Sequence, residues 1–192
     1  MNNKTKTMVG IALLIALIVV LQYVGGLIPP IGGFTISLVL IPIVVGAALY
    51  GPGAGALLGG VFGVIVVIGC VEGTDPGGAM VFQANPILCV VVVLAKGILA
   101  GFAAGWTYRL LAKKNSILAM ICCAIVCPVV NTGVFVACMM LFFKDVLAAW
   151  AGGGDILAYV LTGLILANFV PELVINVVFG TAGQQIIKFA KK

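Results

Sequence analysis

Long uninterrupted apolar runs constrain this chain more than any other feature. The run at residues 117–143 contains no charged side chain and is apolar on every helical face. A helix that is apolar all round must be surrounded by apolar groups, which for a small protein means lipid. The composition agrees, because 64% of the residues are hydrophobic and only 8% are charged. We therefore predict an all-α integral membrane protein rather than a water-soluble domain.

Six segments have the apolar character of membrane-spanning helices. A spanning helix needs about 20 apolar residues, since each residue rises about 1.5 Å through a hydrocarbon core about 30 Å thick. Four runs are long enough, and two short neighbours are joined by a Gly- and Pro-rich turn, so a re-entrant hairpin is an alternative for those two. The long runs are residues 7–24, 87–111, 117–143 and 156–189, and the short runs are residues 35–50 and 54–68. The sequence thus predicts one domain over residues 1–192, a bundle of six transmembrane helices.

The distribution of Lys and Arg predicts the orientation of this bundle. Basic residues accumulate in loops that stay cytoplasmic, and here they precede the first run, separate the fourth and fifth runs, and close the chain. Both termini are therefore expected in the cytoplasm. The opposite, outer side carries the longer connections, and we expect the first two of them to close over a bound ligand. These connections are residues 25–34, 69–86 and 144–155.

Few polar side chains lie at membrane depth, and such groups usually face the interior of a bundle and mark a site. Three such residues lie at a similar depth. Counted from the cytoplasmic end of its own run at about 1.5 Å per residue, each lies about 20 to 24 Å into the membrane. They are Lys96, Asn131 and Glu172. In the last run, Asn168, Glu172 and Asn176 recur at four-residue spacing and share one helix face. We therefore predict that these five residues bind a small polar ligand.

Two amides of the second outer connection, Gln83 and Asn85, are further candidates for substrate binding. In the functional interpretation, Lys96 neutralises a carboxylate, Glu172 holds Lys96 or binds a ligand hydroxyl or amine, and the amides supply donors and acceptors. A structural interpretation remains open. In that case Lys96 pairs with Glu172, and the asparagines join helices by interhelical hydrogen bonds.

The chain has six cysteines and no histidine, and four of the cysteines lie in one apolar run. They are expected to be small buried hydrophobes, so we predict no metal site and no bound cofactor. Only Cys70 and Cys89, which flank one outer connection, are positioned to pair. No phosphate-binding loop, aspartate cluster or nucleophile elbow is present, so neither ATP hydrolysis nor another enzyme activity is expected. Nucleic acid is not expected as a partner, because the basic residues form no stripe.

Three stretches carry a family resemblance: the small-residue pair Ala12 and Ala16, the passage Leu-Ile-Pro-Ile-Val-Val-Gly-Ala-Ala-Leu-Tyr-Gly-Pro-Gly-Ala-Gly at residues 40–55, and Lys-Gly-Ile-Leu-Ala-Gly at residues 96–101. With the six-span plan, they make essentially the whole chain resemble the substrate-binding S component of an energy-coupling-factor (ECF) vitamin transporter. The resemblance implies high-affinity binding of a vitamin or similar micronutrient for uptake across a prokaryotic cell membrane. It also implies assembly with a transmembrane coupling subunit, contacted by Ala12 and Ala16, and with two cytoplasmic ATPases.

The substrate stays open among several vitamins. Nickel and cobalt members of the family use an N-terminal histidine that this chain lacks, whereas Lys96 among asparagines favours a small acid such as pantothenate. Two other classes of protein would use the same polar residues. They are a self-contained secondary transporter or channel, and a structural membrane subunit in which the polar groups only join helices.

Overall fold

The computed structural model describes residues 3–26 and 37–190, which are almost entirely helical. Within these ranges no strand occurs, so the prediction of an all-α fold is confirmed. The elements are α1 (Asn3–Gly26), α2 (Leu40–Tyr50), α3 (Pro52–Glu72), α4 (Pro76–Ala84), α5 (Pro86–Leu111), α6 (Ser116–Phe142), α7 (Lys144–Trp150), α8 (Ile156–Tyr159), the π-helix η1 (Val160–Phe169) and α9 (Val170–Ala190).

Five helical segments of the described chain are long and apolar enough to cross a membrane. Four of them are α1, α3, α5 and α6, and the fifth is the continuous helix formed by α8, η1 and most of α9. The sixth candidate, α2, has 11 residues, which corresponds to about 16 Å of helix and to about half of a hydrocarbon core. The first residues of the expected segment 35–50 lie outside the described ranges, so a sixth crossing stays a prediction.

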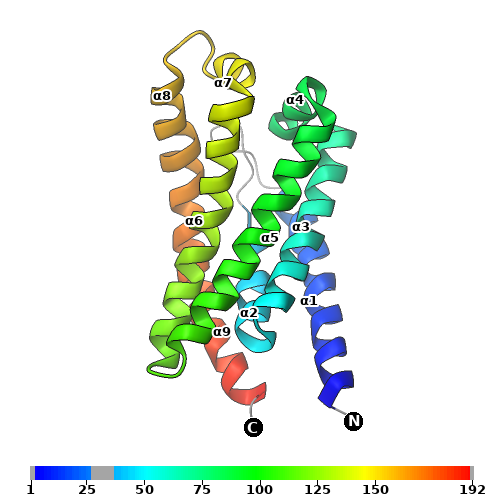
Figure 1. The fold of residues 1–192 in the computed structure, drawn as a ribbon, viewed down its shortest axis with the longest axis vertical. Helices are drawn as coiled ribbons and strands as arrows, with labels where there is room; N and C mark the ends of the chain where they lie inside the picture. Colours follow the sequence, from blue (N-terminus) through cyan, green and yellow to red (C-terminus); the bar gives the residue numbers. More distant parts are fainter. Residues whose placement is uncertain (1–2, 27–36, 191–192) are drawn as a thin grey trace.

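Figure 1 shows how the helices lie along the long axis of the molecule. The beginning of α1 and the end of α9 are at the same end, together with the turn between α5 and α6. That turn carries Lys113 and Lys114, and the first turns of α1 carry Lys4 and Lys6. The short helices α4, α7 and α8 lie at the opposite end, and α2 lies in the half near the termini. These four lysines, expected on one side of the membrane, thus lie at one end, while Lys191 and Lys192 lie outside the described residues.

The connections that we expected to be long loops are largely helical, which corrects the prediction. Residues 69–86 are divided among the last turn of α3, the whole of α4 and the first residue of α5, and residues 144–155 include α7. Asp75 explains α4, because its carboxylate accepts a hydrogen bond from the backbone N–H of Gly78 at 3.2 Å and Pro76 occupies the first helical position. Of the connection 25–34, only the first two residues are described, and they belong to α1.

Asparagine side chains begin two of the spanning helices. The Asn85 side chain accepts a hydrogen bond from the Leu88 backbone N–H at 3.0 Å, and Asn115 accepts from the N–H groups of Ile117 and Leu118 at 2.9 and 3.2 Å. Each cap satisfies donors that a helix N-terminus leaves free. The tight turns between α3, α4 and α5 and between α5 and α6 are therefore stabilised locally.

Glycines bring α3 and α5 into backbone contact. A Cβ atom at Gly59 would overlap the carbonyl oxygen of Gly97, and a Cβ at Gly101 would overlap that of Gly55. Small residues are the usual means of close helix approach in membranes, where there is no hydrophobic force between helices. The α3–α5 interface is therefore fixed by the shape of the two backbones, and it forms the wall from which one side of the site is built.

Candidate functional site

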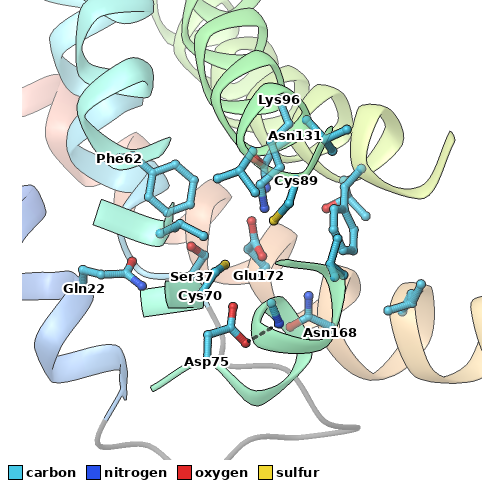
Figure 2. Close-up of a pocket in the computed structure, with 18 residues that line it drawn as sticks. Gln22, Ser37, Phe62, Cys70, Asp75, Cys89, Lys96, Asn131, Asn168 and Glu172 are labelled. Atoms are coloured by element: carbon cyan, nitrogen blue, oxygen red, sulfur yellow. Dashed lines mark hydrogen bonds between the residues drawn. The ribbon is translucent and has the colours of Figure 1, made fainter. Parts of the chain in front are cut away.

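A cavity of about 90 Å³ lies among α3, α4, α5, α6 and the η1–α9 helix. Its lining mixes apolar side chains with a group of polar and charged ones, several of which point toward one another (Figure 2). The lining comprises Gln22, Ser37, Phe62, Val66, Cys70, Asp75, Gly78, Val81, Cys89, Val92, Val93, Lys96, Asn131, Thr132, Phe135, Leu164, Asn168 and Glu172. An apolar pocket with a few convergent polar groups is the usual form of a small-molecule site.

Among the described residues, Lys96 on α5 is the only Lys or Arg of the cavity lining. Its Nζ lies 4.8 Å from the centre of the Phe135 ring and 5.8 Å from the centre of the Phe62 ring. At these distances the negative faces of both rings attract the ammonium group. Phe62 is itself 2% exposed, so the aliphatic and cationic parts of Lys96 are held against a fixed surface.

Three side chains of the lining have oxygen atoms that accept no hydrogen bond. They are Oδ1 of Asn131 on α6, Oδ1 of Asn168 in η1, and Oε1 of Glu172 on α9. Asn131 is 5% exposed and Glu172 is 2% exposed, so bulk water does not satisfy them. Leaving a buried polar group without a partner costs about 1–3 kcal/mol each. The unpartnered oxygen atoms therefore lower the free energy of unfolding of the empty protein. Such atoms are typical of a site in which a bound ligand supplies the missing hydrogen bonds.

The backbone of the last spanning helix is irregular where it meets the cavity. Residues 160–169 form a π-helix, and the N–H of Val170 is bonded to the carbonyl of Ile165, five residues earlier. Pro171 follows and cannot donate a backbone hydrogen bond. Single π-turns are frequent at functional sites, and here the π-helix carries Asn168 and leads directly to Glu172.

Glu172 also lies close to the beginning of α2. Ser37, three residues before α2, lines the same cavity as Glu172, and no side chain caps α2, whose preceding residue is Val39. A carboxylate near a helix N-terminus is stabilised by the free N–H groups and by the helix dipole. Oε1 of Glu172 nevertheless has no hydrogen-bond partner.

The end of the cavity under α4 carries Asp75, Cys70 and Cys89. The two thiols, from α3 and α5, are free and both line the cavity. The two cysteines whose pairing the sequence left open are therefore not joined by a disulfide in this structure. Asp75 faces the cavity while its Oδ1 caps α4.

Four of the predicted substrate-binding residues line this one cavity: Lys96, Asn131, Asn168 and Glu172. Asn176 is fully buried one turn beyond Glu172 and does not line it, and its Nδ2 donates to the Glu172 backbone carbonyl at 3.3 Å. The other two predicted residues, Gln83 and Asn85, are exposed and also lie outside the lining. The Asn85 side chain is engaged in capping α5.

Several lining residues were not predicted, among them Phe62, Phe135 and Asp75. Spacing could have indicated the two phenylalanines. Phe135 follows Asn131 by four residues on α6, and Phe62 follows Gly59 by three on the face of α3 that meets α5. Asp75 was visible as an acid followed by proline, the pattern of a helix N-terminus. The cavity contacts of Gln22 and Ser37 have no comparable local pattern.

Outside the cavity, Ala12 and Ala16 lie on the exposed face of α1. In α1, 11% of the most apolar stretch is buried, whereas in α6 the share is 44%. The helix therefore offers most of its surface to lipid or to another protein. Among the described residues, no group of three or more His, Cys, Asp or Glu side chains is arranged to hold a metal ion.

Comparison with known proteins gives one result. The family model described as the substrate-specific component of the ECF transporter matches residues 6–182. No curated protein and no solved structure matches the chain. The match covers three of the five membrane-spanning candidates completely and all but the end residues of the first and the last.

Proposed function

Since this chain belongs to the substrate-specific components of energy-coupling-factor transporters, we propose that its cavity binds the small polar substrate that the transporter imports. The observation that carries the proposal is the group of buried, unpartnered oxygen atoms on Asn131, Asn168 and Glu172, which line the same cavity as Lys96. Hydrogen bonds with a ligand would satisfy these atoms.

The positions of the charges support an outward-facing site in a prokaryotic cell membrane. The basic ends of α1 and of the α5–α6 turn lie at one end of the molecule, and α4, which covers the cavity, lies at the other (Figure 1). With the basic end in the cytoplasm, both termini are inside and the cavity lies in the outer part of the bilayer. A substrate would then enter past α4.

The exposed face of α1 supports a role for Ala12 and Ala16 in assembly with the coupling subunit, which in turn works with two ATPases. Small exposed residues at four-residue spacing allow another helix to approach closely. We expect Ala16→Trp to prevent co-purification with the coupling subunit and to leave ligand binding unchanged, because Ala16 lies outside the cavity. Normal recovery of the whole complex with this variant would contradict the assignment, provided that thermal unfolding is unchanged.

The proposed site is tested by identifying the small molecule that co-purifies with the detergent-solubilised protein. Mass spectrometry of extracts should detect one polar compound with the wild type. Asn131→Ala and Asn168→Ala should each weaken its binding by about 1–3 kcal/mol, because each removes a hydrogen bond without stranding a charge. Calorimetry with the identified compound measures the loss. Unchanged affinity in both variants, with unchanged folding, would show that the amides only join helices.

The transport class is tested separately by uptake into cells. We expect uptake of the identified compound only when the coupling and ATPase subunits are also present. Equal uptake by cells that make this chain alone would identify a self-contained secondary transporter or channel.

A further inference from the structure

The cavity lining contains more acidic than basic side chains. One amino group, that of Lys96, shares the cavity with two carboxyl groups, those of Glu172 and Asp75. Figure 2 shows these three groups pointing into the same space from α5, α9 and the start of α4. No other Asp, Glu, Lys or Arg side chain lines the cavity in the described part of the chain. A ligand that enters the cavity therefore meets two carboxyl groups and one amino group.

The hydrogen-bonding atoms that lack a partner in the lining also favour a ligand that donates protons. The atoms without partners on the cavity wall are all acceptors: Oδ1 of Asn131, Oδ1 of Asn168 and Oε1 of Glu172. Each of them can be satisfied only by an N–H or O–H donor. Two of these side chains are more than nine-tenths buried, so the donor must come from something enclosed in the cavity.

The one cation is already compensated by the protein. Lys96 lies over the rings of Phe62 and Phe135, and it shares the cavity with the carboxyl groups of Glu172 and Asp75. An anionic ligand would gain the attraction of Lys96 but would meet two carboxyl groups and the two unpartnered amide oxygens of Asn131 and Asn168. A ligand with a protonated nitrogen would meet a favourable field and would donate to the same three oxygens.

Resting on the proposed function, we infer that the substrate carries a protonated amine or similar cationic nitrogen, which binds against Asn131, Asn168 and Glu172. An oxygen acceptor elsewhere in the same molecule suits the N–H groups of Lys96. This ligand chemistry differs from the small acid that Lys96 alone had indicated. The cavity lining sets two carboxyl groups and two unpartnered amide oxygens against the single amino group of Lys96.

The test uses three probes that share one ring and differ in charge: benzylamine, benzyl alcohol and benzoate. The apolar part of the lining, which includes Phe62, Val92 and Leu164, suits a ring. Affinity for the detergent-solubilised protein is measured by calorimetry and by the shift in the thermal unfolding midpoint. We expect benzylamine to bind at least tenfold more tightly than benzoate, with benzyl alcohol between them.

Two cavity variants and one matched control assign the preference to the carboxylates. Glu172→Gln should reduce the preference for benzylamine over benzyl alcohol by about tenfold, because it removes a charge-assisted hydrogen bond. The same substitution at Glu72, which is exposed and outside the lining, should leave the preference unchanged. If Glu172→Gln does not fold, Asp75→Asn serves instead, since asparagine also caps helices, and a twofold to threefold reduction is expected.

Tighter binding of benzoate than of benzylamine would overturn the inference about charge and would leave the proposed function standing, since an anionic substrate could still occupy the same cavity. Failure of all three probes to bind would also overturn the inference. An equal reduction by Glu72→Gln and Glu172→Gln would contradict the assignment to the cavity. The proposed function fails only in the separate experiments on co-purification and uptake.

Discussion

The two walls of the cavity are built on opposite principles. The wall formed by α3 and α5 is a glycine-mediated contact in which Gly55 and Gly59 touch the backbone of the neighbouring helix. The wall formed by α6, η1 and α9 contains a proline in α6, a π-helix and three oxygen atoms without partners. One wall is optimised for packing and the other retains unsatisfied groups. The difference teaches that backbone packing is concentrated on α3 and α5 and unpartnered oxygen atoms on α6, η1 and α9, while Lys96 and Phe62 bring the packed wall into the site as well.

The largest effect that separates the two walls is expected at Gly59. Gly59→Ala should lower the free energy of unfolding by about 3 kcal/mol, because its Cβ would overlap a backbone carbonyl oxygen that cannot move aside. Gly60→Ala is the matched control on the same helix, since its Cβ would lie 3.5 Å from a side-chain atom of Ile98. Thermal or denaturant unfolding in detergent measures both. Equal stability of the two variants would show that α3 and α5 are not held by their backbones.

A smaller effect of opposite sign is expected on the polar wall. Asn131→Leu keeps the approximate size of the side chain and removes an acceptor without a partner, so it should raise the free energy of unfolding of the empty protein by about 1 kcal/mol. The same variant should bind the co-purifying ligand more weakly. Clear destabilisation, measured by the same unfolding assay, would mean that Asn131 supports the bundle and that the contrast between the walls is smaller than described.

The smallest effect is expected at the helix that covers the cavity. Asp75→Ala removes the cap of α4 and should loosen this nine-residue helix by about 1 kcal/mol. Amide hydrogen exchange should accelerate in α4 and remain unchanged in α5, and Asp75→Asn should restore protection. Bound ligand should slow exchange in α4 if this helix closes over the site. Equal exchange with and without ligand would argue against a gating role.

The positions of the long helices could be predicted from the sequence because lipid requires continuous apolar runs. The run 87–111 differs by one residue from α5, and the run 117–143 differs by one residue at each end from α6. The short segment 35–50 was less certain for the same reason, since length is the criterion and α2 is brief. The helices α4 and α7 were missed because hydropathy carries no information about short helices near the membrane surface.

The polar residues of the site could be predicted in part. Lys96, Asn131, Asn168 and Glu172 were found because a polar group at membrane depth is rare. Gln83 was chosen for its place in an outer connection, but α4 leaves it exposed and outside the lining. The π-helix could not be predicted, because nothing in the local sequence distinguishes it from an α-helix, and the packing of neighbouring helices decides which forms.

The late start of α2 bears on how the cavity is bounded. α2 begins at Leu40, and Ser37, three residues earlier, lies outside any helix and lines the cavity together with Glu172. A further turn of α2 at its beginning would add about 5 Å of helix and would place new side chains where Ser37 now meets the cavity. The starting point of this one helix is therefore a dimension along which the volume available to cargo can be tuned while α3, α5 and α6 keep their packing.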